Sequence, residues 1–299
     1  MRVLITGGSG FIGRRLCDRL ADSGHELLVV SRNPASAAAK LPAGTRVKPN
    51  VHDFVADQPD AVVNLAGEPI AEGRWSESKK SELVDSRVRI TRAVAELCRT
   101  AETPPRVLVS ASAMGYYGDQ GDHDVTEETP PHQEFVHELC ARWEDAAHEV
   151  EDQGVRVAIA RIGLVLDQGG GMLAKTLTPF KLGVGGRLGN GKQYMPWIHR
   201  DDMVRILIFL LERDDLSGPF NASAPNPVTN AEFTQTLASE LNRPAILPAP
   251  AIALKLAFGE MSRLLLTGAK MLPKRLANAG FEFRYSSLEA ALKDILDAE

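Results

Sequence analysis

The chain has 299 residues, a length that corresponds to two domains of ordinary size or to one large α/β unit with an appended lobe. Hydrophobic residues make up 44% of the sequence and charged residues 24%, which excludes disordered, collagen-like and fibrous chains. The 39 acidic side chains outnumber the 34 basic ones and give a net charge of −5, so we expect no nucleic-acid partner.

The cysteines and the apolar runs indicate in which cellular compartment the protein is expected. Cys17, Cys98 and Cys140 are widely spaced and form no Cys-x-x-Cys pair, which favours a reducing compartment and argues against a disulfide framework. No apolar run approaches the roughly 18 residues that a spanning helix needs. The apolar stretch near Met1 is too short for a signal peptide. We therefore expect a cytoplasmic protein with no membrane partner.

Runs of β-branched residues and leucine alternate with helix-like segments through the first two thirds of the chain. The expected strands are 2–6, 26–31, 61–65, 106–110 and 155–162, and the expected helices are 11–23, 79–100 and 133–153. This alternation predicts an α/β fold with a doubly wound, parallel Rossmann-type sheet.

The pattern changes after the last of these strands. Residues 169–195 are rich in glycine and lysine and have weak periodicity, which predicts an ordered excursion or a lid. A helix at 201–212 then returns to the core, and a proline-rich linker, an apolar helix at 252–266 and an amphipathic helix at 287–296 follow. We expect a dinucleotide-binding domain at 1–168 and 197–240, with a smaller, interleaved α/β substrate lobe at 169–196 and 241–299.

The first expected strand runs through Thr6 into a glycine-rich turn and then into a helix. Gly8, Gly10 and Gly13 satisfy G-x-G-x-x-G, and Gly7, Gly10 and Gly13 satisfy the wider G-x-x-G-x-x-G. Glycine allows a tight turn, close approach of main-chain N–H groups to a diphosphate, and close packing of helix on strand. The strand before the turn and the helix after it favour a dinucleotide site over a plain structural turn.

The end of the second strand indicates which dinucleotide is bound. NAD sites usually carry an acidic residue about 20 residues after the glycines, which accepts a hydrogen bond from the ribose 2′-hydroxyl. This chain has Ser31 and Arg32 there. A hydroxyl and a permanent cation suit a 2′-phosphate, so we expect NADP(H) rather than NAD. The alternative is that Arg32 is a solvated residue at the end of a strand.

Several longer stretches carry a family resemblance. They are TGGSGFIG at 6–13, NLAGEPIAEGRW at 64–75, SASAMGYYG at 110–118 and PFKLGVGGRLGNGKQYMPWIHRDD at 179–202. Together they resemble the extended branch of the short-chain dehydrogenase/reductase superfamily. Within it they are similar to the "epimerase family protein" group, an NAD-dependent epimerase/dehydratase-like group with a C-terminal domain of unknown function.

The resemblance implies a set of cofactor contacts. They would come from the glycine turn, the end of the second strand, the segment after the third strand, the long helix and the turn after residue 162: Gly7, Gly10, Phe11, Ile12, Gly13, Ser31, Arg32, Leu65, Ala66, Gly67, Glu82, Arg87 and Leu164. Glu82 and Arg87 would face the cofactor cleft, the alternative being a surface ion pair. Leu164 would lie against the nicotinamide.

The catalytic helix departs from the superfamily pattern. That pattern is Tyr-x-x-x-Lys, and the resemblance places Val136 at the tyrosine position and Cys140 at the lysine position. Valine has no proton to exchange, and a thiol with a reference pKa of about 8.5 does not stabilise a phenolate at neutral pH. Tyr117, with Ser112, is the candidate replacement. The alternative is that both residues only line the pocket.

For the remaining polar candidates we expect neither a catalytic role nor metal binding. The resemblance favours a structural role for His199 and Asp202, since buried polar groups are usually paired. His137 and Glu138 lack the second histidine of His-Glu-x-x-His, so we expect no metal site.

The excursion at 169–195 carries four cations among its glycines: Lys175, Lys181, Arg187 and Lys192. They would suit an anionic group of a substrate, although a solvated loop is the alternative.

Together these features predict an NADP(H)-binding, atypical extended dehydrogenase/reductase. It would act as an epimerase or oxidoreductase on a small, nucleotide-linked or otherwise anionic substrate. The alternative is a non-catalytic NADP(H)-binding module that senses redox state, with a link to cell division suggested only by the resemblance. Neither the substrate nor the oligomeric state follows from the sequence.

Overall fold

The computed structural model describes residues 1–297, and a seven-stranded parallel sheet lies at its centre. The strand order is β11-β7-β5-β4-β1-β2-β3. The strands are β1 (Arg2–Thr6), β2 (Glu26–Val30), β3 (Arg46–Lys48), β4 (Ala61–Asn64), β5 (Val107–Ala113), β7 (Arg156–Ile162) and β11 (Gly218–Ala222). The direction of winding reverses between β1 and β4, and this opens a crevice at the carboxyl ends of the strands. The predicted doubly wound α/β fold is confirmed.

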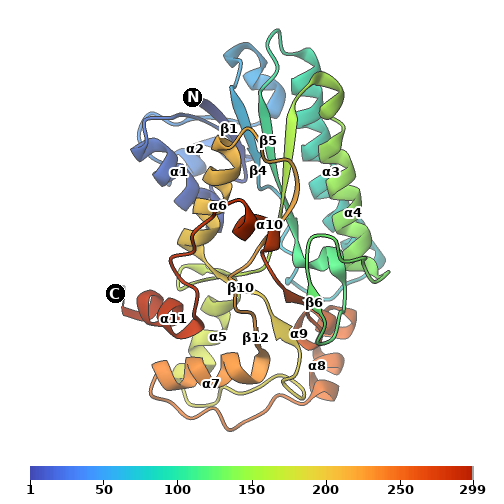
Figure 1. Cartoon of the computed structure of the whole chain (residues 1–299), viewed down its shortest axis with the longest axis vertical. Helices are drawn as coiled ribbons and strands as arrows, with labels where there is room; N and C mark the ends of the chain where they lie inside the picture. Colours follow the sequence, from blue (N-terminus) through green and yellow to red (C-terminus); the bar gives the residue numbers. More distant parts are fainter. Residues whose placement is uncertain (298–299) are drawn as a thin grey trace.

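Helices cover both faces of this sheet (Figure 1). On one face α1 (Phe11–Asp22) and α6 (Arg200–Glu212) share a core with the buried side chains of β1 and β7. On the other face α3 (Glu77–Thr100) and α4 (Phe135–His148) pack with the 3-10 helix η1 (Val51–Asp57). Burial on both faces explains why the strands read as continuous apolar runs rather than as alternating ones.

A separate hydrophobic core, the second core, lies in the lower half of the molecule in Figure 1, apart from the packing on the two faces of the sheet. It contains β8 (Leu164–Asp167), α5 (Gly171–Lys181), β10 (Trp197–His199), α7 (Asn230–Glu240) and α11 (Leu288–Asp297). Strands β8 and β10 pair in parallel, and β9 (Tyr194–Met195) pairs antiparallel with β12 (Val228–Thr229). The lobe around this core adjoins the carboxyl end of the sheet, because β7 leads through Gly163 directly into β8.

Short elements complete the chain. They are α2 (Pro34–Ala38), η2 (Met114–Tyr117), β6 (Asp124–Val125), η3 (Glu151–Gln153), α8 (Ala251–Phe258), η4 (Gly259–Ser262), α9 (Arg263–Leu266), β13 (Lys270–Met271) and α10 (Lys274–Asn278).

Two expected elements differ from the structure. The segment 169–195, expected to be an ordered excursion or a lid, contains a regular helix, α5, which the sequence did not predict. The apolar helix expected at 252–266 is interrupted at Gly259, whose φ of +60° ends α8. Helix α6 packs on the seven-stranded sheet, and β11 is one of its strands, whereas α7 packs in the core of the lobe. The proposed division at residue 240 remains a prediction.

Candidate functional site

The turn between β1 and α1 is a cradle that only glycine fits. Gly7 has a φ of +70°, and a Cβ there would lie 2.8 Å from the main-chain carbon of Leu65. A Cβ on Gly13 would lie 2.2 Å from the carbonyl oxygen of Gly7. Gly10 is the N-cap of α1 and supplies no side-chain acceptor. The first N–H groups of α1 are thus available to an anion, and the helix dipole favours one there.

A buried polar network supports this turn from below. The Thr6 hydroxyl donates to Asn64 Oδ1 at 2.6 Å and accepts from the main-chain N–H of Ala66 at 3.2 Å. The Asn64 amide donates to the hydroxyls of Thr91 at 2.8 Å and Ser110 at 3.2 Å. These bonds tie the ends of β1, β4 and β5 to α3, and they fix the segment 65–67 against the glycine turn.

The carboxyl end of β2 is open and basic. Ser31 is partly buried, and its hydroxyl accepts from the main-chain N–H of Asn33 at 3.3 Å. Arg32 is exposed, and within residues 1–297 its guanidinium has no hydrogen-bond or ion-pair partner. No acidic residue occurs between Glu26 and Asp53. The end of β2 thus has a free cation that could bind a 2′-phosphate. It has no carboxylate of its own that could accept a hydrogen bond from a ribose 2′-hydroxyl.

Arg87 is buried beside the segment after β4. Its guanidinium donates to the carbonyl oxygens of Leu83 at 2.9 Å and Glu68 at 3.0 Å. A Cβ on Gly67 would lie 3.0 Å from Arg87 Cζ, so the guanidinium lies against the Gly67 main chain. Burial lowers the pKa of Arg87. This placement supports the main-chain path of 66–68.

Glu82 is not brought together with Arg87. Its half-exposed carboxylate pairs with Lys79 at 3.2 Å. The alternative of a surface ion pair is therefore wrong, because Arg87 is buried and Glu82 pairs with Lys79. That both residues face the cofactor cleft stays a prediction.

The face of α4 that carries Val136 and Cys140 packs against the turn after β5. A Cβ on Gly115 would lie 3.2 Å from Val136 Cβ and 3.6 Å from Cys140 Sγ. The Cys140 thiol is buried and contacts the carbonyl oxygen of Ala113 at 3.8 Å. Burial raises the pKa of Cys140 to about 12, so the group is a neutral thiol. Neither Val136 nor Cys140 therefore supplies an acidic proton or a cation at neutral pH.

Tyr117 and Ser112 lie in a buried network that centres on Arg161. The Arg161 guanidinium donates to both oxygens of Glu144, at 2.9 and 2.8 Å, and to the Tyr117 hydroxyl at 3.0 Å. The Ser112 hydroxyl donates to Glu144 Oε1 at 2.6 Å, and the Tyr117 hydroxyl donates to Asn221 Oδ1 at 2.6 Å. Burial raises the pKa of Tyr117 to about 12, despite the nearby Arg161.

Both hydroxyls are thus occupied by protein partners, and both side chains are shielded from solvent. The ring of Tyr116, by contrast, lies directly over the Arg161 guanidinium, 3.3 Å from its Cζ. The catalytic role of Tyr117 and Ser112 stays a prediction, and the geometry gives both residues a structural one. The sequence signal for this network is Arg161 itself, a cation near the carboxyl end of a strand whose residues between it and Arg156 are all apolar.

Of three further cofactor candidates, Phe11 and Leu164 contact segments of the lobe, whereas Ile12 lies in the core of the sheet domain. The Phe11 ring packs against the turn before α5, where a Cβ on Gly170 would lie 2.6 Å from it. Ile12 is partly buried in the core between α1 and the sheet. Leu164 begins β8, and its N–H donates to the carbonyl of Pro196 at 2.7 Å.

His199 and Asp202 have the structural roles that we expected. His199 caps α6 by accepting from the N–H of Asp201 at 3.1 Å. Asp202 accepts from the N–H groups of Arg284 and Tyr285, both at 3.0 Å, and so holds the chain that leads to α11.

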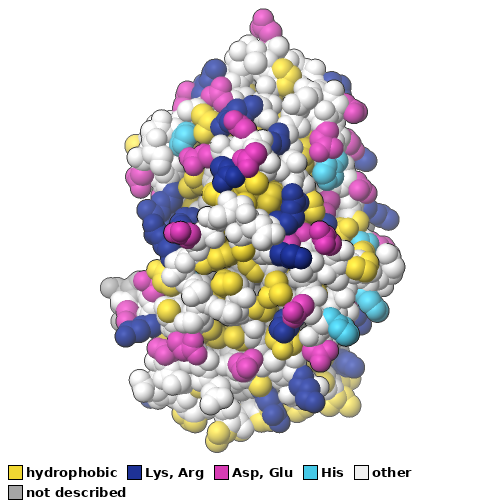
Figure 2. All heavy atoms as spheres, in the orientation of Figure 1, with side chains coloured by type: hydrophobic (Ala, Val, Ile, Leu, Met, Phe, Trp, Pro, Cys, Tyr) yellow, Lys and Arg dark blue, Asp and Glu magenta, His cyan; other side chains and the backbone are white. Residues whose placement is uncertain are grey.

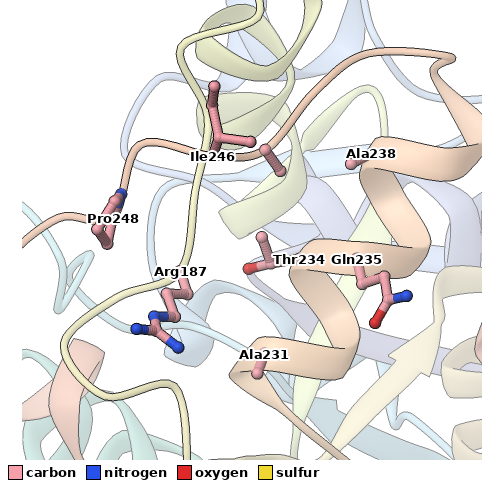
Figure 3. Close-up of a pocket in the computed structure, with 8 residues that line it drawn as sticks. Arg187, Ala231, Thr234, Gln235, Ala238, Ile246 and Pro248 are labelled. Carbon is pink, nitrogen blue, oxygen red and sulfur yellow. The ribbon is translucent and has the colours of Figure 1, made fainter.

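The substrate-side cations are spread over the lobe. Lys175 of α5 donates to the carbonyl of Ala71 at 3.4 Å, which connects the lobe to the loop after β4. Arg187 lines a cavity of about 390 Å³ between α7 and the linker, with Thr234, Ile246 and Pro248 around it (Figure 3). This cavity belongs to the lobe rather than to the glycine turn.

Residues 1–297 contain neither a metal-binding cluster nor a membrane-spanning helix. No group of three or more His, Cys, Asp or Glu side chains in this range could hold a metal ion. No helix in the same range has the length and apolar character to cross a membrane.

Comparison with known proteins identifies the family. Residues 3–223 match the "NAD dependent epimerase/dehydratase family", and residues 249–295 match a "Domain of unknown function (DUF1731)". The chain belongs to the NAD dependent epimerase/dehydratase family. This epimerase-family chain is 40% identical over 307 residues to the "Epimerase family protein SDR39U1 homolog, chloroplastic" of Arabidopsis thaliana, covering 99% of this chain and 87% of that protein.

Its human and structural relatives extend over the same length. The epimerase family protein SDR39U1 of Homo sapiens is 37% identical, covering 99% of this chain and all of that protein. The crystal structure of human SDR39U1 isoform 2 with NADPH matches this epimerase-family chain with a TM-score of 0.91 and 36% identity over the full length of both. The predicted resemblance is confirmed.

Proposed function

We propose that this chain binds NADPH in preference to NADH. The observation that carries the proposal is the end of β2, where Arg32 is exposed, has no partner among residues 1–297, and has no carboxylate beside it in the chain. The glycine cradle and the uncapped start of α1 suit a diphosphate. The human relative was crystallised with NADPH, which supports the same choice.

The proposed activity is that of an epimerase or oxidoreductase on a small anionic substrate. Bound NADPH would supply hydride chemistry, while the chain binds and orients the cofactor through the glycine turn, Ser31, Arg32 and the segment 65–67. Lys175, which donates to the loop after β4, would attract an anionic substrate. Since Val136 and Cys140 carry no acid or cation, this activity does not rest on the tyrosine and lysine of the superfamily.

The second candidate is a non-catalytic NADPH-binding module that signals through the C-terminal lobe. It is favoured by one observation: the α4 face at Val136 and Cys140 is apolar and holds a neutral thiol. The two candidates share the cofactor and differ in whether a hydride is transferred.

Thermal unfolding with each dinucleotide tests the cofactor proposal. A ligand at 100 times its dissociation constant stabilises the folded state by about 2.7 kcal/mol, so NADPH raises Tm clearly and NADH at the same concentration raises it less. Arg32→Asp reverses this preference, whereas Lys40→Gln, a change at the next exposed cation along the chain, leaves it intact. Equal shifts with both dinucleotides in the wild type would refute the proposal.

Turnover separates the two candidates. NADPH oxidation is followed spectroscopically while the protein is offered a panel of small anionic aldehydes, ketones and sugar phosphates. An epimerase returns the hydride it removes and causes no net oxidation, so the sugar phosphates are also offered to the NADP⁺-loaded protein and epimer formation is followed by NMR. Substrate-dependent oxidation or epimer formation supports the enzyme. Normal cofactor binding without either reaction for any member of the panel supports the non-catalytic module.

A further inference from the structure

The exposed apolar side chains of this protein gather at one end of the molecule. Among residues 1–297 the large hydrophobic side chains that are exposed are Leu182, Val184, Ile246, Leu247, Ile252, Leu256 and Phe258. Four of them, at 182, 246, 252 and 256, are between 72% and 77% exposed. Such a cluster differs from the scattered exposed apolar residues of an ordinary surface, and it indicates an interaction site.

Three segments bring these side chains together. The loop after α5 runs beside the linker, because Arg243 Nε donates to the carbonyl of Lys181 at 3.0 Å and the N–H of Ala249 donates to the carbonyl of Arg187 at 2.9 Å. The linker then leads directly into α8. We call the exposed side chains of 181–187, 243–248 and 252–258 the tip surface. Figure 2 shows yellow apolar side chains with dark-blue cations along this lower edge.

The charge of the tip surface is of one sign. No acidic residue occurs between Asp167 and Asp201, or between Glu240 and Glu260, although the whole chain is acidic. Within the tip surface Lys181, Arg187, Arg243 and Lys255 are exposed among the apolar side chains. Cations that flank protruding apolar groups are the pattern of a surface that lies on an anionic bilayer.

A hollow for a lipid headgroup adjoins these side chains. The cavity of about 390 Å³ is lined by Arg187, Thr234 and Gln235 on its polar side and by Ile246 and Pro248 of the linker (Figure 3). None of its lining residues is acidic, and within residues 1–297 the Arg187 guanidinium has no carboxylate partner. A phosphate-bearing headgroup would find a cation and two hydrogen-bonding side chains there.

We propose that the tip surface docks this protein peripherally on membranes that contain anionic phospholipids. Ile246, Leu247, Ile252 and Leu256 enter the acyl boundary, Lys181, Arg243 and Lys255 face the anionic headgroups, and Arg187 holds a lipid phosphate in the adjoining cavity. The expectation that the chain has no membrane partner rested on the lack of a long apolar run, which concerns spanning helices only.

Vesicle flotation of the full chain tests this proposal. Vesicles of phosphatidylglycerol with phosphatidylcholine should carry the protein upward, and pure phosphatidylcholine vesicles should not. Ile252→Ser with Leu256→Ser lowers the partition coefficient about a hundredfold, since two inserted side chains are lost. Arg187→Gln lowers it about fivefold, from about 1 kcal/mol for each cation at the surface. These side chains are exposed, so the variants keep the wild-type Tm.

Lys293→Gln, a change at an exposed cation on α11 outside the tip surface, is the matched control and leaves flotation unchanged. Three outcomes would overturn the proposal. They are no flotation on either vesicle, equal flotation on both, or flotation that the tip variants do not alter. Light scattering adds a fourth: a concentration-dependent dimer that Ile252→Ser with Leu256→Ser abolishes would identify a second copy of the chain as the occupant instead.

Discussion

Replacing Glu144 with glutamine should destabilise the protein strongly, because it leaves a buried cation without its counter-charge. Arg161 has a side chain that is only 4% exposed, and both of its bonds to a carboxylate go to Glu144. Removal of one partner from a buried ion pair costs about 3–5 kcal/mol. With an m-value of about 3 kcal/mol/M, the urea midpoint should fall by about 1 M or more.

A matched change on the surface calibrates this result. Arg92 and Glu149 also form an ion pair, but their side chains are 64% and 38% exposed. Glu149→Gln should therefore shift the free energy of unfolding by about 0.5 kcal/mol or less. Adding Arg161→Met to Glu144→Gln should recover part of the stability, since it removes the unpaired charge. Equal, small effects of Glu144→Gln and Glu149→Gln would refute the view that Glu144 neutralises a buried Arg161.

Two further predictions concern single groups. Tyr117→Phe should lower the free energy of unfolding by about 1–3 kcal/mol, because Asn221 Oδ1 loses its buried donor, while the NADPH dissociation constant from titration calorimetry stays unchanged. Full stability combined with loss of turnover would instead make Tyr117 catalytic. Asp201, bonded to Arg15 and Arg19, has a pKa lowered to about 2, so its stabilisation is complete above about pH 4 and is lost as the pH falls toward 2. Asp201→Asn should flatten the pH dependence of unfolding in that window by about 1–2 kcal/mol, less than the full shift because both arginines are partly exposed, and an unchanged slope would contradict this assignment.

The sequence predicts best those elements whose residue pattern follows directly from burial. The strands near 2–6, 26–30 and 61–64 are continuous apolar runs, because both faces of the sheet are covered. The edge strands β3 and β11 escaped prediction. One is three residues long, and the other contains glycine, proline and asparagine, which disfavour strands in general.

Two helices of the lobe were missed for different reasons. α5 begins among glycines and contains Pro179, so its pattern resembles a loop. α7 has weak amphipathicity, but Thr229 and Glu232 form a capping box, a signal that the sequence does carry.

The site residues also differ in how well the sequence predicts them. The glycine cradle follows from one local motif, and the structure shows the steric contacts that require it. The network around Arg161 does not follow from local sequence, because Ser112, Glu144 and Asn221 come from separate elements that only the fold brings together. The alternative that Glu82 and Arg87 form a surface ion pair was wrong for a related reason. Helical spacing places residues on a face but does not say which of them is buried.

A crystal structure of this chain with NADPH tests the central claim most directly. We expect the diphosphate at the N-terminus of α1 beside Gly7 and Gly10, and the 2′-phosphate at Arg32 and Ser31. Tyr117 should retain its bonds to Asn221 and Arg161. A 2′-phosphate that makes no contact with Arg32, or a dinucleotide bound away from the glycine turn, would contradict that claim.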